Sequence, residues 1–133
     1  MNWNEYKDKL KSIIKGIPSE QKLQFAIEIC DRLLPDYQNF SELYKWGKIN
    51  KLRDGLKYCK EFANGIELEI DSAKKLIIEI EKNTPNSEDF GQVEGSLALN
   101  TACAISETLS FIMDKNNDRI LDIGSFGYDT VYF

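Results

Sequence analysis

Residues 95–114 read GSLALNTACAISETLSFIMD, and they predict a helix that is apolar on nearly every side. Its apolar positions recur at steps of three and four, which is the spacing of one helix face: Ala98, Ala102, Ile105, Leu109 and Ile112. Glu107 is its only charged residue before Asp114. A helix with so little polar surface is typical of the centre of a bundle. We therefore expect an all-α fold, a compact antiparallel helical bundle with this helix at its centre.

Outward from this stretch, the same periodicity predicts a bundle of about six to seven helices. The expected helices are Asn4–Lys15, Ser19–Leu34, Asp36–Trp46, Asn50–Ala63, Glu67–Lys82 and Gly95–Asp114, with Asn117–Phe133 an ambiguous seventh. The linkers between them are short, as in antiparallel bundles. The chain of 133 residues, 42% of them apolar, is expected to form a single helical domain over residues 1–133.

Several helix boundaries follow from capping and proline rules. Ser19 and Asn50 are candidate N-caps. Pro35 is expected to end the second helix, because a proline ring disfavours helical backbone at the preceding residue. Phe40, Leu43 and Tyr44 of the next helix are expected to face inward. The strict alternation of residues 66–70 leaves a strand as the alternative to the start of the fifth helix.

The absence of histidine removes the commonest catalytic base and metal ligand. Serine–histidine and cysteine–histidine nucleophile systems are excluded with it. Cys30, Cys59 and Cys103 are far apart and form no Cys-x-x-Cys pair, so neither a disulfide framework nor a zinc knuckle is expected. We expect each cysteine to be a small buried apolar side chain.

One stretch, Asp114–Asp122, imitates a calcium-binding loop. The sixth position of such a loop needs glycine and the twelfth a bidentate glutamate, but Arg119 and Ser125 stand there. A solvated turn is therefore the better interpretation. The sequence predicts no metal, no cofactor and no catalytic residues.

The net charge of −5 is unevenly distributed. Residues 1–66 hold 12 basic and nine acidic side chains, whereas residues 67–133 hold five basic and 13 acidic ones. This balance argues against nucleic-acid binding and favours a protein partner with a basic surface. The alternative is an ordinary solvated face. The candidate partner-binding residues are Glu67, Glu69, Asp71, Glu88, Asp89 and Glu94.

A second candidate site combines three polar residues expected on the second and central helices: Arg32, Asn100 and Glu107. Polar groups on an apolar helix must find partners, so a buried network or a small polar pocket is expected there. Arg32 has an alternative role, since an arginine at a helix end often bonds the last carbonyls.

Three stretches carry a family resemblance: Ile29–Phe40 (ICDRLLPDYQNF), Pro85–Phe90 (PNSEDF) and Ala98–Glu107 (ALNTACAISE). In order and spacing they resemble the YjaG-like family of bacterial proteins of unknown function. The resemblance implies an all-α bundle and no established activity. The chain differs from the family at Asn100, where members usually have aspartate, and members usually continue into a further long C-terminal helix.

These observations favour a non-catalytic, acidic protein-binding module, such as an immunity- or antitoxin-type inhibitor of a basic effector. The alternative is a small-molecule binder or a carboxylate-dependent enzyme with its site between the second and the central helix. The start of the chain does not read as a secretory signal, and no uninterrupted apolar run reaches the roughly 18–20 residues that span a bilayer. We therefore expect a cytoplasmic protein with no membrane contact.

Overall fold

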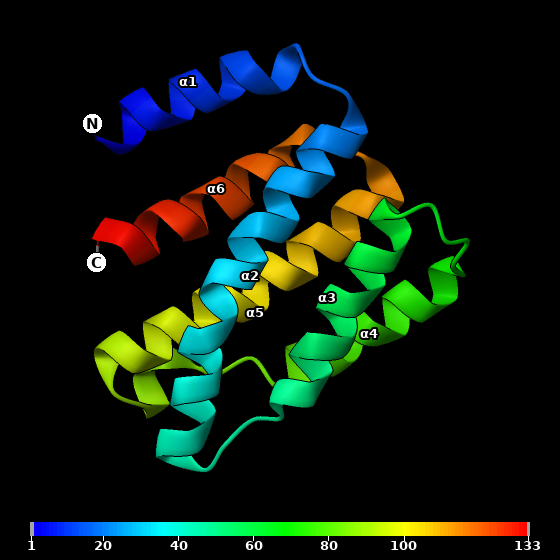
Figure 1. Ribbon diagram of the computed structural model, residues 1–133. Coiled ribbons are helices and arrows are strands. Elements are labelled where there is room, and N and C mark those ends of the chain that lie inside the picture. The colour runs from blue at the N-terminus through cyan, green and yellow to red at the C-terminus, as the bar shows by residue number, and fades with distance from the viewer. Residues whose placement is uncertain (1, 133) are drawn as a thin grey trace.

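The computed structural model describes residues 2–132, and within that range it describes only the backbone of residues 87, 92 and 130–132. The described chain is an all-α bundle without strands, which confirms the predicted fold class. Figure 1 shows α1 lying along α6 at one edge of the bundle and the α3–α4 pair at the other. The elements are α1 (Trp3–Lys15), α2 (Ser19–Tyr44), α3 (Ile49–Ala63), α4 (Ile70–Lys82), the 3-10 turn η1 (Ser87–Asp89), α5 (Gln92–Asp114) and α6 (Asn117–Tyr132).

The central helix is α5, as the sequence predicts. It packs against α2, α3, α4 and α6 (Figure 1). Its inward positions are completely buried: Ala98, Ala102, Ala104, Ile105, Leu109 and Phe111. Within the described residues, the stretch Val93–Asp114 is also the one segment apolar and long enough to span a bilayer, but half of it is buried inside the bundle. A core helix of a bundle has the same composition.

Two buried threonines give α5 its polar contacts with α2. The Thr101 hydroxyl lies 2.9 Å from the Leu97 carbonyl of its own helix and 3.0 Å from the Leu33 carbonyl of α2. The Thr108 hydroxyl donates to the Ala104 carbonyl, which leaves the Cys30 thiol as the donor across the 3.4 Å Sγ–Oγ1 contact. Both hydroxyls are therefore satisfied without water.

The prediction of two helices separated at Pro35 is wrong, because α2 runs unbroken from Ser19 to Tyr44. The buried face continues across the proline, with Leu33 before it and Tyr37 and Phe40 after it. Burying large side chains such as these stabilises by about 1.5–3 kcal/mol each, which together exceeds the roughly 3 kcal/mol cost of a helical proline. Pro35 itself is exposed, so water can reach the carbonyl that lacks its helical donor.

Other boundaries also differ from the predictions. Pro18 and Lys48 occupy the N-cap positions expected for Ser19 and Asn50, and neither provides a side-chain cap. The central helix begins three residues early, at Gln92, and the ambiguous last segment is the helix α6. Residues 66–69 form an extended connector that is neither helix nor strand, and α4 begins only at Ile70.

The N-terminal helix α1 rests on α6 through a small aromatic group. The rings of Trp3, Tyr6 and Tyr128 lie 5.5–5.6 Å apart, centroid to centroid. Leu10 and Ile14 are the buried side chains of α1. The close approach of the two helices depends on Gly124, where a Cβ would lie only 2.5 Å from a Leu10 methyl carbon.

Candidate functional site

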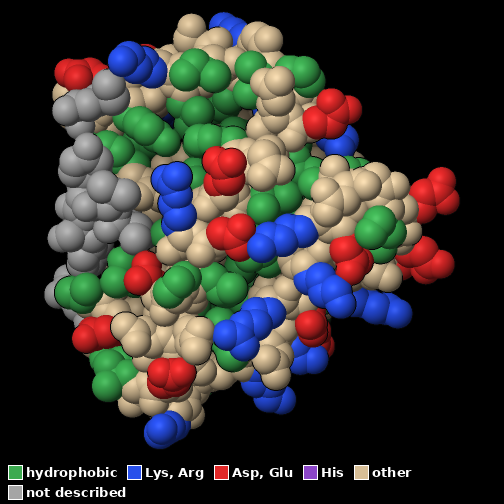
Figure 2. All heavy atoms as spheres, viewed as in Figure 1, with side chains coloured by type: hydrophobic (Ala, Val, Ile, Leu, Met, Phe, Trp, Pro, Cys, Tyr) green, Lys and Arg blue, Asp and Glu red, His purple; other side chains and the backbone are tan. Residues whose placement is uncertain are grey.

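The six candidate partner-binding residues do not form one surface. Glu67, Glu69 and Asp71 lie at the start of α4, whereas Glu88, Asp89 and Glu94 follow the end of α4. A helix of 13 residues separates the two groups, and this corresponds to about 20 Å along its axis. All six side chains are exposed. On the face shown in Figure 2, acidic and basic side chains are interspersed rather than gathered by sign.

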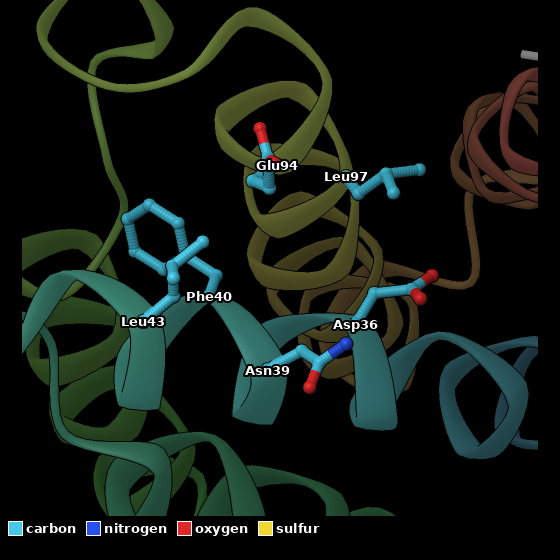
Figure 3. A pocket seen from close by; sticks show the side chains of 6 residues that line it. All are labelled: Asp36, Asn39, Phe40, Leu43, Glu94 and Leu97. Carbon is cyan, nitrogen blue, oxygen red and sulfur yellow. The ribbon is translucent and has the colours of Figure 1, made fainter.

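One of the six, Glu94, lines a hollow of about 270 Å³ between the second half of α2 and the start of α5. We call this hollow the α2–α5 groove, and Figure 3 shows its side chains. α2 contributes four of them and α5 contributes two: Asp36, Asn39, Phe40, Leu43, Glu94 and Leu97. The groove thus combines two carboxylates with an apolar wall.

The apolar wall is open to solvent. Leu43 is 62% exposed, although the sequence predicts that it faces inward, and Val93, one turn before Leu97, is 49% exposed. The prediction is wrong for Leu43, whereas Phe40, three residues earlier, is fully buried as predicted. Leu43 is therefore left on the side of the helix that borders the groove (Figure 3).

The two carboxylates of the groove have no cationic partner among the described residues. The ion pairs of the described chain lie elsewhere and involve neither Asp36 nor Glu94. Partial burial raises the pKa of Asp36, because a carboxylate removed from water is less stable when ionised. A cation placed in the groove would offset that cost.

Phe40 of the groove belongs to an aromatic cluster with Tyr44, Trp46 and Phe90. The Phe40 and Phe90 rings meet edge to face with centroids 4.8 Å apart, and the Tyr44 ring lies 5.2 Å from Phe90. The Gly91 N–H donates to the Tyr44 hydroxyl over 2.9 Å. A Cβ at Gly91 would overlap that hydroxyl. The cluster therefore fixes the start of α5 against the end of α2.

The sequence profile of a family described as "Protein of unknown function (DUF416)" matches residues 9–132. The chain belongs to the DUF416 family. It is similar to a crystal structure of a DUF416 family protein from Shewanella baltica OS155, with 29% identity and a TM-score of 0.80. The alignment covers 95% of this chain and 62% of that one, so this chain spans less than two thirds of the solved relative. Among curated proteins, none matches the sequence.

In this DUF416 chain, the second predicted site is not built as expected. Arg32 is exposed on α2, and Asn100 is partly buried on α5. The Glu107 carboxylate instead pairs with Arg119 of α6, with 3.2 Å between Oε2 and Nη1. Glu107 lines a separate hollow, and neither Arg32 nor Asn100 is among the side chains that line it.

The surroundings of Glu107 nevertheless perturb its pKa. Burial raises the pKa of Glu107, and the Arg119 guanidinium opposes part of that rise. The same guanidinium contacts Asp114, whose pKa is lowered mainly by the backbone N–H of Asn116. The imitation calcium loop is therefore an ion-paired helix junction.

The cysteines are core residues with one partial exception. Cys30 and Cys59 are completely buried, and burial raises the pKa of the Cys30 thiol to about 12. Cys103 is only partly buried. Within residues 2–132, no group of three histidine, cysteine, aspartate or glutamate side chains is arranged to hold a metal ion.

Sequence reasoning missed Asp36, Asn39, Leu43 and Leu97 as groove residues. Part of the signal was present in the sequence spacing, because residues 36, 39, 40 and 43 recur at helical steps directly after the proline. The predicted helix Asp36–Trp46 already held these positions, but the spacing along one helix does not show that the start of α5, with Glu94 and Leu97, lies beside them.

Proposed function

We propose that this chain is a non-catalytic protein-binding module whose α2–α5 groove receives a basic, partly apolar segment of a partner protein. The observation that carries the proposal is the combination of the Asp36 and Glu94 carboxylates, which form no ion pair among the described residues, with the exposed Leu43 side chain. A lysine or arginine with an apolar neighbour would match both features.

The physical argument is one of complementarity. An exposed leucine beside a rigid aromatic floor gains free energy when it is covered, at about 25 cal/mol per Å² of apolar surface removed from water. The groove carboxylates would favour basic partners and speed their encounter. Glu88 and Asp89, which are exposed just before the start of α5, extend the same negative field.

The mode of action that fits best is inhibition by covering, as in immunity- or antitoxin-type proteins. Such a protein needs no catalytic group, only a surface that matches its target. From the same sequence features we propose a cytoplasmic location and membership of the YjaG-like branch of bacterial proteins.

The test uses purified protein and the basic proteins encoded by neighbouring genes, with binding measured by isothermal titration calorimetry. The double variant Asp36→Asn/Glu94→Gln should weaken binding about tenfold, since solvent-accessible ion pairs contribute roughly 0.2–1 kcal/mol each and a factor of ten corresponds to about 1.4 kcal/mol. The matched control, Glu67→Gln/Glu69→Gln, removes the same charge at the far end of α4 and should leave affinity unchanged.

Two results would overturn the proposal. One is the absence of binding to every such protein. The other is an equal loss of affinity in the control variant, which would show that net charge rather than the groove determines binding. The small-molecule alternative has a separate basis in the hollow beside Glu107.

A further inference from the structure

A second hollow, of about 350 Å³, lies where the end of α4 meets α5 and α6. We call it the Cys103 hollow. Its lining comes from α4, the segment after it, α5 and α6: Glu81, Thr84, Cys103, Ser106, Glu107 and Phe126. It is separate from the α2–α5 groove and shares no lining residue with it.

The lining is rich in unused hydrogen-bond acceptors. The contact of Glu107 with Arg119 uses Oε2, and among the described residues Oε1 has no hydrogen-bond partner. The Glu81 carboxylate, the Ser106 hydroxyl and the Cys103 thiol likewise have no side-chain hydrogen bond within the part of the chain that is described. The Thr84 hydroxyl donates to the Ile80 carbonyl over 2.8 Å and can still accept.

The charges around the hollow favour a cation. Glu81 and Glu107 are acidic, and the hollow lies at the C-terminal end of α4, where the helix dipole is negative. The nearby cations are already engaged, since Arg119 binds Glu107 and Asp114 while Lys82 binds Glu79. None of the described residues that line the hollow offers a positive group to an anion.

The size and the donor set favour an organic cation over a metal ion. No group of three potential ligand side chains is arranged for a metal within residues 2–132. A volume of about 350 Å³ corresponds to the lower end of small-molecule sites. The Phe126 ring adds an apolar wall that can pack against an alkyl chain or an ammonium group.

We infer that the Cys103 hollow binds a small organic cation with a primary ammonium group. The ammonium donates its three hydrogens to Glu107 Oε1, the Glu81 carboxylate and the Ser106 or Thr84 hydroxyl, while the alkyl part lies against Phe126. This site is independent of the protein partner proposed for the α2–α5 groove.

Cys103 provides a built-in reporter of occupancy. It is the partly exposed cysteine, whereas Cys30 and Cys59 are fully buried, so a neutral thiol reagent such as iodoacetamide should modify Cys103 first in the folded protein. The probes are n-butylammonium and its neutral analogue n-butanol, at constant ionic strength. We expect n-butylammonium to slow modification of Cys103 severalfold at saturation and n-butanol to leave the rate unchanged.

Two variants locate the cation. Glu81 forms no ion pair within the part of the chain that is described, so Glu81→Gln should preserve the fold and raise the half-effective n-butylammonium concentration about fivefold to tenfold. Glu107→Gln should raise the half-effective n-butylammonium concentration at least as much. Glu67→Gln, at the opposite end of α4 from the hollow, is the matched control and should behave like the unmodified protein.

Amide chemical shifts of Thr84 and Ser106 provide a second readout that does not depend on thiol reactivity. Saturable shifts with n-butylammonium alone support the site. The inference is wrong if n-butanol protects equally, if neither probe has an effect, or if Glu67→Gln weakens binding as much as Glu81→Gln does. None of these results bears on the groove, whose own test uses protein partners.

Discussion

At the scale of single residues, two lysines stand in left-handed backbone geometry where glycine is the usual residue. Lys45 closes α2 with φ 53°, and Lys115 closes α5 with φ 55°. Left-handed backbone costs an L-residue roughly 1–2 kcal/mol. The two differ in their side chains, because the Lys115 ammonium lies 5.0 Å from the centroid of the Phe62 ring and 5.7 Å from that of Phe111.

Lys45→Gly is therefore predicted to stabilise the protein by about 0.5–1 kcal/mol. The variant removes the free-energy cost of left-handed backbone, but glycine loses more conformational entropy on folding than lysine does, and this offsets part of the gain. The measurement is the midpoint of urea unfolding. Lys115→Gly is the comparison, and its gain should be smaller or absent because its cation–π contacts, worth about 0.5–1 kcal/mol, are lost. A lower midpoint for Lys45→Gly would contradict the argument.

At the scale of the elements, the junction of α5 and α6 is held by charges with opposite pH behaviour. Arg119 of α6 bridges Glu107 and Asp114 of α5 with contacts of 3.1–3.2 Å. Burial raises the pKa of Glu107 above its ordinary 4.5. The Asn116 N–H, together with Arg119, lowers the pKa of Asp114 below its ordinary 3.8.

These shifts predict opposite pH profiles for two variants. Above pH 4.5 Glu107 ionises more readily in the unfolded chain than in the folded one. The free energy of unfolding of the unmodified protein, relative to that of Glu107→Gln, should therefore fall as the pH rises through that value. Relative to Asp114→Asn, the stability contributed by Asp114 is present above pH 3.8 and should be lost as the pH falls below it. Urea unfolding over this pH range measures both.

Profiles of the same sign for the two variants would show that the burial of Glu107 does not dominate its titration. The comparison is internal, because both carboxylates contact the same guanidinium. A general effect of net charge would change the free energy of unfolding of both variants in the same direction with pH.

The long helix α2 shows which local rules the fold overrides. Periodicity correctly predicted the existence of nearly every helix and the buried positions of α5, because long amphipathic patterns survive any tertiary context. The break at Pro35 failed because burial of Tyr37 and Phe40 outweighs a local penalty. The start at Glu67 failed because Ile66 and Ile70 are exposed, at 49% and 57%, and stabilise no helical turn there.

At the scale of the whole molecule, stability should be concentrated around α5. This helix contacts most of the bundle, whereas α1 packs chiefly on α6 with Leu10 and Ile14 buried. The candidate sites also belong to this scale. Glu94 and Glu107 could be identified as polar residues from the sequence, but their groove and hollow depend on which helices meet, and helical spacing does not determine that.

Hydrogen exchange is predicted to be slowest in α5 and faster at the edge of the bundle. Amides of α5 should exchange only through global unfolding, whereas those of α1 and of the connector 66–69 should exchange through smaller, local openings. Exchange monitored by mass spectrometry under native conditions provides the measurement. Protection of α1 equal to that of α5 would show that the bundle opens as one unit.

The two tryptophans lie in different aromatic groups, and this gives the molecule two optical reporters. Trp3 is packed with Tyr6 and Tyr128 where α1 meets α6, while Trp46 lies 5.3 Å from the Phe90 ring in the aromatic cluster that includes Phe40 of the α2–α5 groove. Emission from a protein that retains only Trp46 will follow events at the groove. Emission from one that retains only Trp3 will follow detachment of α1. Fluorescence can thus distinguish fraying of the bundle edge from occupation of the groove without any attached dye.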